Sequence, residues 1–159
     1  MDKHQWIKLA ISIAICQLAG IIGSVFTANS VGTWYKTLIK PIFNPPSWIF
    51  GPVWIILFVL MGISLYLVWN AKTKDKKTKR TAIAVFGIQL FLNILWSLFF
   101  FGLQQPYYAF VEIIFLWVGI LASMILFYRI SKTAAYLLIP YILWVSFAIV
   151  LNYYLWILN

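Results

Sequence analysis

The sequence contains few of the residues from which most enzyme and metal sites are built. Its 159 residues include one cysteine, one histidine and three acidic residues. The single cysteine, Cys16, excludes a disulfide within the chain and a metal site made of cysteines. The single histidine, His4, lies at the start of the chain, so we expect neither a catalytic histidine nor a histidine ligand for haem iron in the interior. We therefore predict no metal site and no required cofactor.

Charged residues are scarce as well, at 9% of the chain, whereas soluble domains contain about a quarter. Hydrophobic residues make up 64%, which indicates a protein surrounded by lipid. The net charge is +9, and most of it falls in one short run, Lys72–Arg80. We interpret this run as a solvated turn that fixes the topology, with a patch for anionic lipids as the alternative. Neither interpretation involves nucleic acid, and we predict no such partner.

Five apolar stretches are long enough to cross a bilayer, which takes about 20 residues each. They lie at about residues 7–26, 51–69, 81–101, 107–128 and 134–156. The first has no clear cleavage site after it, so we expect a retained span and not a signal peptide. The predicted fold class is an all-α membrane protein, with residues 1–159 forming a single domain of five transmembrane helices.

Basic residues are distributed unevenly between the two ends of these spans. With five spans, the N-terminus shares one side with the second-to-third and fourth-to-fifth loops, and that side holds all the basic residues but two. The other side holds only Lys36 and Lys40. The positive-inside rule then predicts a multi-pass protein of the cell membrane with its N-terminus in the cytoplasm and its C-terminus outside.

The connection between the first two spans, about residues 27–50, is rich in proline and aromatic residues. Four of the six prolines lie at positions 41, 45, 46 and 52, and the same region carries Tyr35 and several tryptophans, including Trp34 and Trp48. Proline removes a backbone donor, so we expect no ordinary helix here until after Pro52. Flexible linkers do not have this aromatic content. We predict a stiff lid over one end of the bundle.

Amides and tryptophans mark one face of the third span. Gln89, Asn93 and Trp96 recur at helical spacing, and an amide at membrane depth needs a partner inside the bundle. Two interpretations remain open: the amides bond neighbouring helices, or they offer hydrogen bonds to a ligand.

The fifth span contains Pro140, which we expect to kink it, and a small residue between larger ones on one face. Trp144, Ala148 and Asn152 follow one another at intervals of four residues. The gap at Ala148 admits either a flat ligand or a neighbouring helix. An apolar cavity lined by tryptophan with a few amides suits a flat, hydrophobic aromatic ligand.

Two further features concern helix packing and acidity. Small residues four apart, at Cys16, Gly20 and Ser24, predict close helix packing, either within one chain or at a homodimer seam. Gly119 raises the same question in the fourth span. Glu112 is the only acidic residue inside a span, and its place near a helix start predicts a structural or interfacial role.

Four motifs together carry a resemblance that covers most of the chain. They are WYKTLIKP at Trp34–Pro41, NPPSWIFGPVW at Asn44–Trp54, QLFLNILWSLFF at Gln89–Phe100 and LLIPYILWVSFAIVLNYY at Leu137–Tyr154. In these motifs and their order the chain resembles the TspO/MBR family, which includes the translocator protein or peripheral benzodiazepine receptor, and it looks most like a bacterial member. The resemblance implies a five-helix bundle, often dimeric, that binds porphyrins such as protoporphyrin IX and haem. It also implies isoquinoline and benzodiazepine ligands.

The resemblance places the family's pocket under the first loop and implies its lining residues. These are Tyr35, Trp54, Asn93, Trp96, Trp144, Ala148 and Leu151. Trp54 and Trp144 match two tryptophans implicated in light-dependent porphyrin breakdown in bacterial relatives. The last helix lacks the basic residue that follows the tyrosine in the cholesterol motif of animal members, which argues against high-affinity cholesterol binding.

Three functions are therefore considered. The first is a membrane protein that binds tetrapyrroles as a sensor or transporter, with a porphyrin or another flat hydrophobic molecule, the bilayer and a second copy of the chain as partners. The second is a light- and oxygen-dependent porphyrin-degrading enzyme that uses Trp54 and Trp144. The third is a small multidrug transporter coupled to protons through Glu112.

Overall fold

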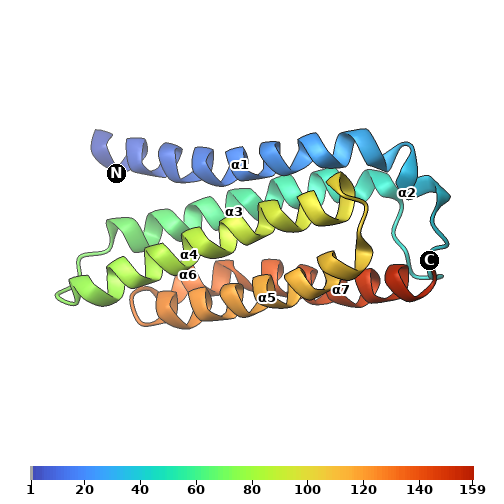
Figure 1. Ribbon diagram of the computed structural model, residues 1–159. Helices are drawn as coiled ribbons and strands as arrows, with labels where there is room; N and C mark the ends of the chain where they lie inside the picture. The colour runs from blue at the N-terminus through green and yellow to red at the C-terminus, as the bar shows by residue number, and fades with distance from the viewer. Residues whose placement is uncertain (1) are drawn as a thin grey trace.

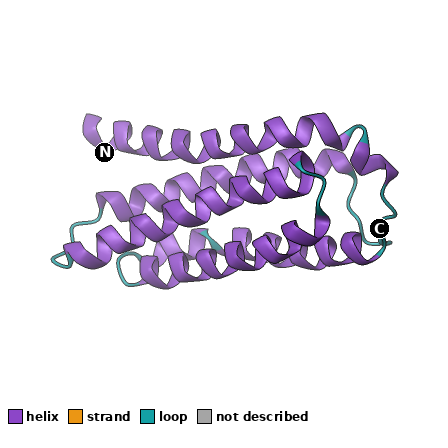
Figure 2. Cartoon of the chain, in the orientation of Figure 1, coloured by secondary structure: helices purple, strands orange, loops and turns teal. Residues whose placement is uncertain are grey.

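Helices account for nearly all of the residues that the structure, a computed structural model, describes, namely 2–159 (Figures 1 and 2). In chain order they are α1 (Lys3–Val31), α2 (Trp34–Thr37), η1 (Ser47–Ile49), α3 (Phe50–Asn70), α4 (Lys76–Ser97), η2 (Leu98–Gly102), α5 (Pro106–Tyr128), α6 (Lys132–Leu137) and α7 (Ile139–Ile157). The described residues contain no β-strand.

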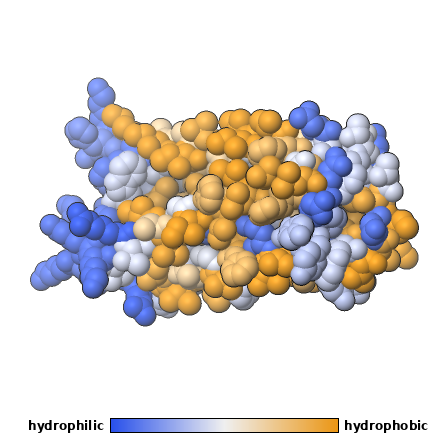
Figure 3. Space-filling view, viewed as in Figure 1, coloured by the Kyte–Doolittle hydropathy of each residue, from blue (hydrophilic) through white to orange (hydrophobic). Residues whose placement is uncertain are grey.

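Five helical segments are long and apolar enough to cross a membrane, which confirms the predicted fold class. They are α1, η1 with α3, α4 with η2, α5, and α6 with α7. The helices extend beyond the predicted spans by several residues at some ends; α1, for example, covers 3–31 where about 7–26 was predicted. Figure 3 shows an apolar belt over the middle of the molecule and hydrophilic residues gathered at the end that carries the N-terminus.

The helices lie side by side with their connections at the two ends (Figure 1). α1 packs on α3 and α4, α5 packs on α4 and α7, and α6 packs on α3 and α5. The N-terminus and the α3–α4 and α5–α6 connections lie at one end, while α2 and the C-terminus lie at the other. The loops therefore alternate between the ends as the basic residues predicted.

Side-chain caps define several helix starts. Asp2 accepts a hydrogen bond from the amide of Gln5, whose side chain in turn accepts one from the Asp2 amide, so a capping box begins α1. Asp75 caps α4 through the amide of Thr78 at 2.9 Å, and this start lies inside the basic run. The basic run thus forms a short turn and the first turn of a helix.

The lid is shorter than predicted. α1 continues to Val31, and η1 at Ser47 leads directly into α3. The lid therefore comprises residues 32–46, with α2 as its one helical turn. The expectation that no helix forms before Pro52 is wrong, because Pro52 lies in the first turn of α3. A proline there loses no intrahelical hydrogen bond, since the first amides of a helix have no partner within it.

The fifth span is interrupted close to the position predicted from Pro140. α6 ends at Leu137 and α7 begins at Ile139, with Pro140 in its first turn. Proline has no amide hydrogen to continue the ladder from the preceding turn, so the helix breaks at Leu138 and resumes.

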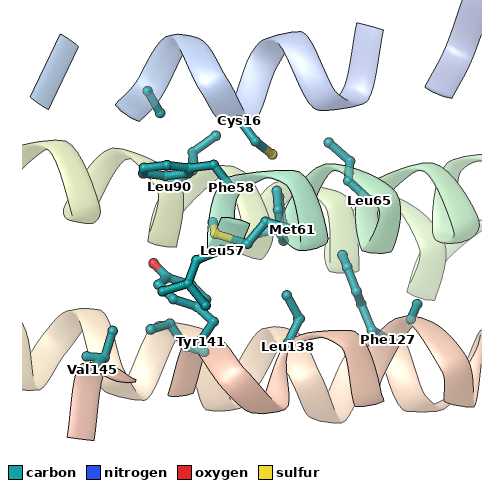
Figure 4. Close-up of a cluster of buried hydrophobic side chains, with 14 of the residues drawn as sticks. Cys16, Leu57, Phe58, Met61, Leu65, Leu90, Phe127, Leu138, Tyr141 and Val145 are labelled. Carbon is teal, nitrogen blue, oxygen red and sulfur yellow. The ribbon is translucent and has the colours of Figure 1, made fainter. Parts of the chain in front are cut away.

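The main core cluster takes side chains from all five spans, α1, α3, α4, α5 and α6 with α7. Figure 4 shows Cys16 from α1, Met61 from α3 and Tyr141 from α7 pointing toward the centre of the bundle. Glycines allow α1 to approach: a Cβ at Gly20 would lie 2.6 Å from the Phe58 ring. A Cβ at Gly119 would lie 3.1 Å from Gln89. These small residues therefore serve packing within one chain, and the homodimer stays a prediction.

The closest helix contact gives a stability prediction. A Cβ at Gly62 of α3 would lie 2.5 Å from the Cα of Ile13 in α1, so Gly62→Ala forces two backbones apart. We expect a loss of about 1–3 kcal/mol, as for overpacked cores, and a lower melting temperature in detergent. Gly87→Ala is the control, because no atom lies within 4 Å of its Cβ position, and we expect it to be neutral or stabilising. Equal melting temperatures for the two variants would contradict the prediction.

Candidate ligand-binding site

A cavity of about 330 Å³ lies beneath the lid, between α1, α3, α4, η2 and α7. All seven residues that the resemblance implied line it: Tyr35, Trp54, Asn93, Trp96, Trp144, Ala148 and Leu151. They come from four segments far apart in the sequence, and the fold brings them together. Their role in holding a ligand stays a prediction.

Aromatic packing fixes the indole rings in the cavity wall. Trp54 stacks on Phe58 with ring centroids 5.5 Å apart, and Trp144 meets Phe50 edge-on at 6.2 Å. Trp96 is stacked at 5.3 Å on an aromatic ring one turn further along its own helix. Rings held in this way present rigid flat faces to the cavity.

The gap predicted at Ala148 opens into the cavity. Ala148 lines it together with Trp144 one turn before and Asn152 one turn after. Of the two alternatives, a ligand or a neighbouring helix, the structure places empty space at this position. The small side chain therefore contributes to the size of the cavity.

A hydrogen-bonded chain joins α4 to α7 below the cavity. The Asn93 amide donates to the Tyr141 hydroxyl at 2.9 Å, and that hydroxyl donates to the Gln89 side-chain oxygen at 2.8 Å. Gln89 does not line the cavity, so its role is to bond the neighbouring helix, whereas Asn93 both bonds α7 and lines the cavity. The sequence did not indicate Tyr141, because a tyrosine in an apolar run has no periodic partner to mark it.

A second set of hydrogen bonds holds Trp96 in place. Its indole nitrogen donates to the Asn152 side-chain oxygen at 3.0 Å, and the Asn152 amide donates to the Pro106 carbonyl at 2.8 Å. These bonds join α4, α7 and the start of α5. They also occupy both polar atoms of the Asn152 side chain, so the cavity presents aromatic surface more than free polar groups.

Sequence reasoning missed part of the lining. The omitted residues include Gln17, Gly20, Ser24, Phe50, Ser97, Phe147 and Leu155. Three of them belong to α1, whose small residues were interpreted only as a packing face. Phe100 and Asn152, which lie on the faces predicted from Trp96 and Ala148, also line the cavity.

A wider helical turn at the end of the fourth span contributes to the cavity wall. η2 is a π-helical turn, and such turns recur at functional sites. Its consecutive side chains Phe100 and Phe101 are both buried and both line the cavity. This turn therefore contributes two aromatic side chains to the wall.

Tyr35 closes the lid end of the cavity. It is buried, and its hydroxyl donates to the Asn44 side-chain oxygen at 2.7 Å. Its ring meets Phe50 edge-on, and the Lys40 ammonium lies 4.9 Å from the ring centroid. Burial raises the pKa of Tyr35 to about 12.

Glu112 is buried inside the bundle. Its side chain is 6% exposed, and neither carboxyl oxygen has a hydrogen-bond partner among the described residues. The structural or interfacial role of Glu112 stays a prediction. Glu112 does not line the cavity. Within residues 2–159, no three metal-binding side chains form a group that could hold an ion.

Comparison with known proteins agrees with this architecture. The model of the TspO/MBR family matches residues 12–157. The chain belongs to the TspO/MBR family. It is 45% identical over 159 residues to the Tryptophan-rich protein TspO of Chlorobaculum tepidum, covering 100% of this chain and 99% of that protein.

Other relatives come from distant organisms. Identity is 45% over 154 residues to the Tryptophan-rich protein TspO of Archaeoglobus fulgidus, covering 96% and 97% of the two chains. Identity is 32% over 151 residues to the Translocator protein of Bos taurus, covering 95% and 89%. Family membership together with five apolar helices makes this TspO/MBR chain a multi-pass membrane protein.

The Tyr35–Asn44 bond gives a prediction with a defined pH range. The neutral hydroxyl donates to Asn44 and the phenolate cannot, so the bond's stabilisation is complete below pH 10 and is lost as pH rises through about 12. Tyr35→Phe should cost about 0.5–1.5 kcal/mol at neutral pH. A phenolate absorbance titration, taken as wild type minus Tyr35→Phe, should show one tyrosine titrating near pH 12. A difference centred near pH 10 would show that the hydroxyl is solvated.

Proposed function

We propose that this protein binds tetrapyrroles, protoporphyrin IX or haem, in the tryptophan-lined cavity beneath the lid and acts as a sensor or transporter. One observation carries the proposal: indole and phenyl rings from the lid end, α3, α4 and α7 surround a single cavity, and none of the described residues lining it is charged. A flat conjugated macrocycle gains most from such stacked aromatic surfaces.

The cavity's size bears on the range of ligands. At about 330 Å³ it is near the lower limit of small-molecule sites, which are roughly 300–1,000 Å³. Ligands of the isoquinoline and benzodiazepine type, suggested by family resemblance, suit this volume. A tetrapyrrole is larger, so part of it would extend out of the cavity. The relative from Bos taurus is named Translocator protein, which is consistent with a transport role here.

We also propose that the protein resides in the cell membrane with its N-terminus in the cytoplasm and its lid outside. The hydrophilic residues at the N-terminal end of the molecule in Figure 3 support this orientation, together with the basic run beginning at Lys72. The multidrug-transporter hypothesis has less support, because Glu112 lies outside the cavity lining.

The Ala148→Phe variant tests the site. The added ring should fill the gap beside Trp144 and weaken protoporphyrin IX binding at least tenfold, or about 1.4 kcal/mol. Binding would be followed by quenching of tryptophan fluorescence in purified protein, with circular dichroism to verify folding. Ala14→Phe is the matched control, since Ala14 is an exposed alanine of α1 outside the cavity. Undiminished affinity in folded Ala148→Phe would show that the ligand binds elsewhere.

A second candidate function is light- and oxygen-dependent porphyrin degradation. The observation in its favour is that Trp54 and Trp144 line the same cavity, so both indoles would contact a bound macrocycle.

Illumination separates the two functions. If the protein degrades porphyrin, absorbance of the bound ligand should fall with time in light and air, and Trp54→Phe or Trp144→Phe should abolish the fall. Trp6→Phe is the control, because Trp6 is 59% exposed near the start of α1. Saturable binding with stable absorbance in light would support a sensor or transporter and exclude degradation.

A further inference from the structure

The cavity has an opening on the side of the bundle, between α1 and α3. Four of its lining residues are exposed on the outer surface: Ile21 and Ser24 of α1, and Gly51 and Ile55 of α3. The two isoleucines are 57% and 59% exposed. Both helices are long and apolar enough to span the membrane, so this opening faces lipid.

The opening arises because α1 changes its neighbour along its length. As far as Gly20, α1 lies against α3: Ile13 meets Gly62 at backbone distance, and a Cβ at Gly20 would lie 2.6 Å from the Phe58 ring. Beyond Gly20 it lies against the fourth helix, where a Cβ at Gly23 would be 3.1 Å from the Ser97 hydroxyl oxygen. Further along, the Ser30 hydroxyl donates to the Phe101 carbonyl at 2.6 Å. The last part of α1 is thereby bonded to the fourth helix and not to the start of α3.

A single side chain joins the two helices at the edge of this opening. The Gln17 amide of α1 donates to the Ile55 carbonyl of α3 at 3.1 Å. Gln17 lines the cavity as well, one turn before Ile21. The opening therefore lies on the lid side of this bond.

The lid end of the cavity, by contrast, is fastened to the end of α7. The Ile39 amide donates to the Asn159 side-chain oxygen at 2.8 Å, and the Asn159 amide donates to the Ile39 carbonyl at 3.0 Å. The same amide donates to the Leu155 carbonyl at 2.9 Å, which fixes it on its own helix. Phe43 adds an edge-on contact with Tyr154 at 5.3 Å.

The surroundings of the two ends also differ in polarity. The lid carries Lys36 and Lys40, and the Lys40 ammonium donates to lid carbonyls, including Leu38 at 3.0 Å. The rim of the side opening consists of apolar side chains, a glycine and a serine whose hydroxyl donates to its own helix at Ile21. A flat apolar molecule, which partitions into lipid, meets no charge there.

We propose that the ligand reaches the cavity from the lipid phase, between α1 and α3, while Asn159 keeps the lid closed. The ligand class rests on the proposed function, and the route rests on the exposed rim and the fastened lid. The rates of association and dissociation are then set by the width of the side opening, and the lid does not move during exchange.

Narrowing the opening tests the route. Gly51 lies on the rim with no atom within 4 Å of its Cβ position, so Gly51→Phe adds a ring at the opening from a position with free space around the Cβ. In lipid nanodiscs preloaded with protoporphyrin IX, binding is followed by tryptophan quenching and release by its reversal. Both the association and the dissociation rate should be at least tenfold lower in Gly51→Phe than in wild type. Gly87→Phe is the matched control, an exposed helical glycine with equal space that lies outside the cavity. Unchanged rates in Gly51→Phe would overturn the proposal.

Releasing the lid tests the second part of the proposal, that the lid stays closed during exchange of the ligand. Asn159→Ala removes the hydrogen bonds to Ile39, so hydrogen–deuterium exchange of the Ile39 amide should rise at least tenfold without any ligand. Protoporphyrin IX rates in the same variant should equal those of wild type. Asn29→Ala is the control, because the Asn29 side chain donates only to Val25 in its own helix.

The outcomes separate the two proposals. Faster ligand association and dissociation in Asn159→Ala would show that the ligand passes beneath the lid, and would overturn the lipid route. Unchanged hydrogen–deuterium exchange of the Ile39 amide in this variant would show that Asn159 does not hold the lid closed. Absence of saturable binding in wild type would overturn the proposed function, whereas saturable binding with unaffected Gly51→Phe rates would overturn the route alone.

Discussion

Hydrogen bonds from a few buried amides fix the helices around the cavity. In lipid, a polar group without a partner costs several kcal/mol, so hydrogen bonds between buried side chains favour one arrangement of the helices. The chain from Asn93 through Tyr141 to Gln89 joins α4 to α7, and the pair of Trp96 and Asn152 joins both to α5. These bonds fix the relative orientation of the helices, because apolar surfaces alone would allow many arrangements.

Around these bonds, small side chains allow the helices to approach and large side chains form the cavity wall. Glycines at positions 20, 23 and 62 bring α1 close to its neighbours, and aromatic rings of α3 and α7 meet edge-on, as Trp54 and Tyr141 do at a centroid distance of 6.2 Å. The rings cannot fill the space beside Ala148, so a cavity remains. Its walls are rigid because each indole is packed or bonded from behind.

Much of this could be predicted from the sequence, because lipid allows few structures. Span lengths and the distribution of basic residues gave the five helices and the alternation of loops, and the motifs gave seven lining residues. The expectation of no helix before Pro52 was wrong because a proline is tolerated in a first turn. The burial of Glu112 was not predicted, because distance along a helix does not reveal which face is buried. Tyr141 and the α1 residues were missed because their partners lie on other helices.

The π-helical turn at Leu98–Gly102 has a consequence for how relatives of this protein could diversify. A π turn contains one residue more than the α turn it replaces, and here it ends the fourth span. Loss of one residue there would shift the residues that follow it by one position around the helix axis, which changes the aromatic side chains that reach the wall. The shape of the cavity can therefore change by a one-codon deletion, a step that leaves the order of all the other lining residues in the sequence intact.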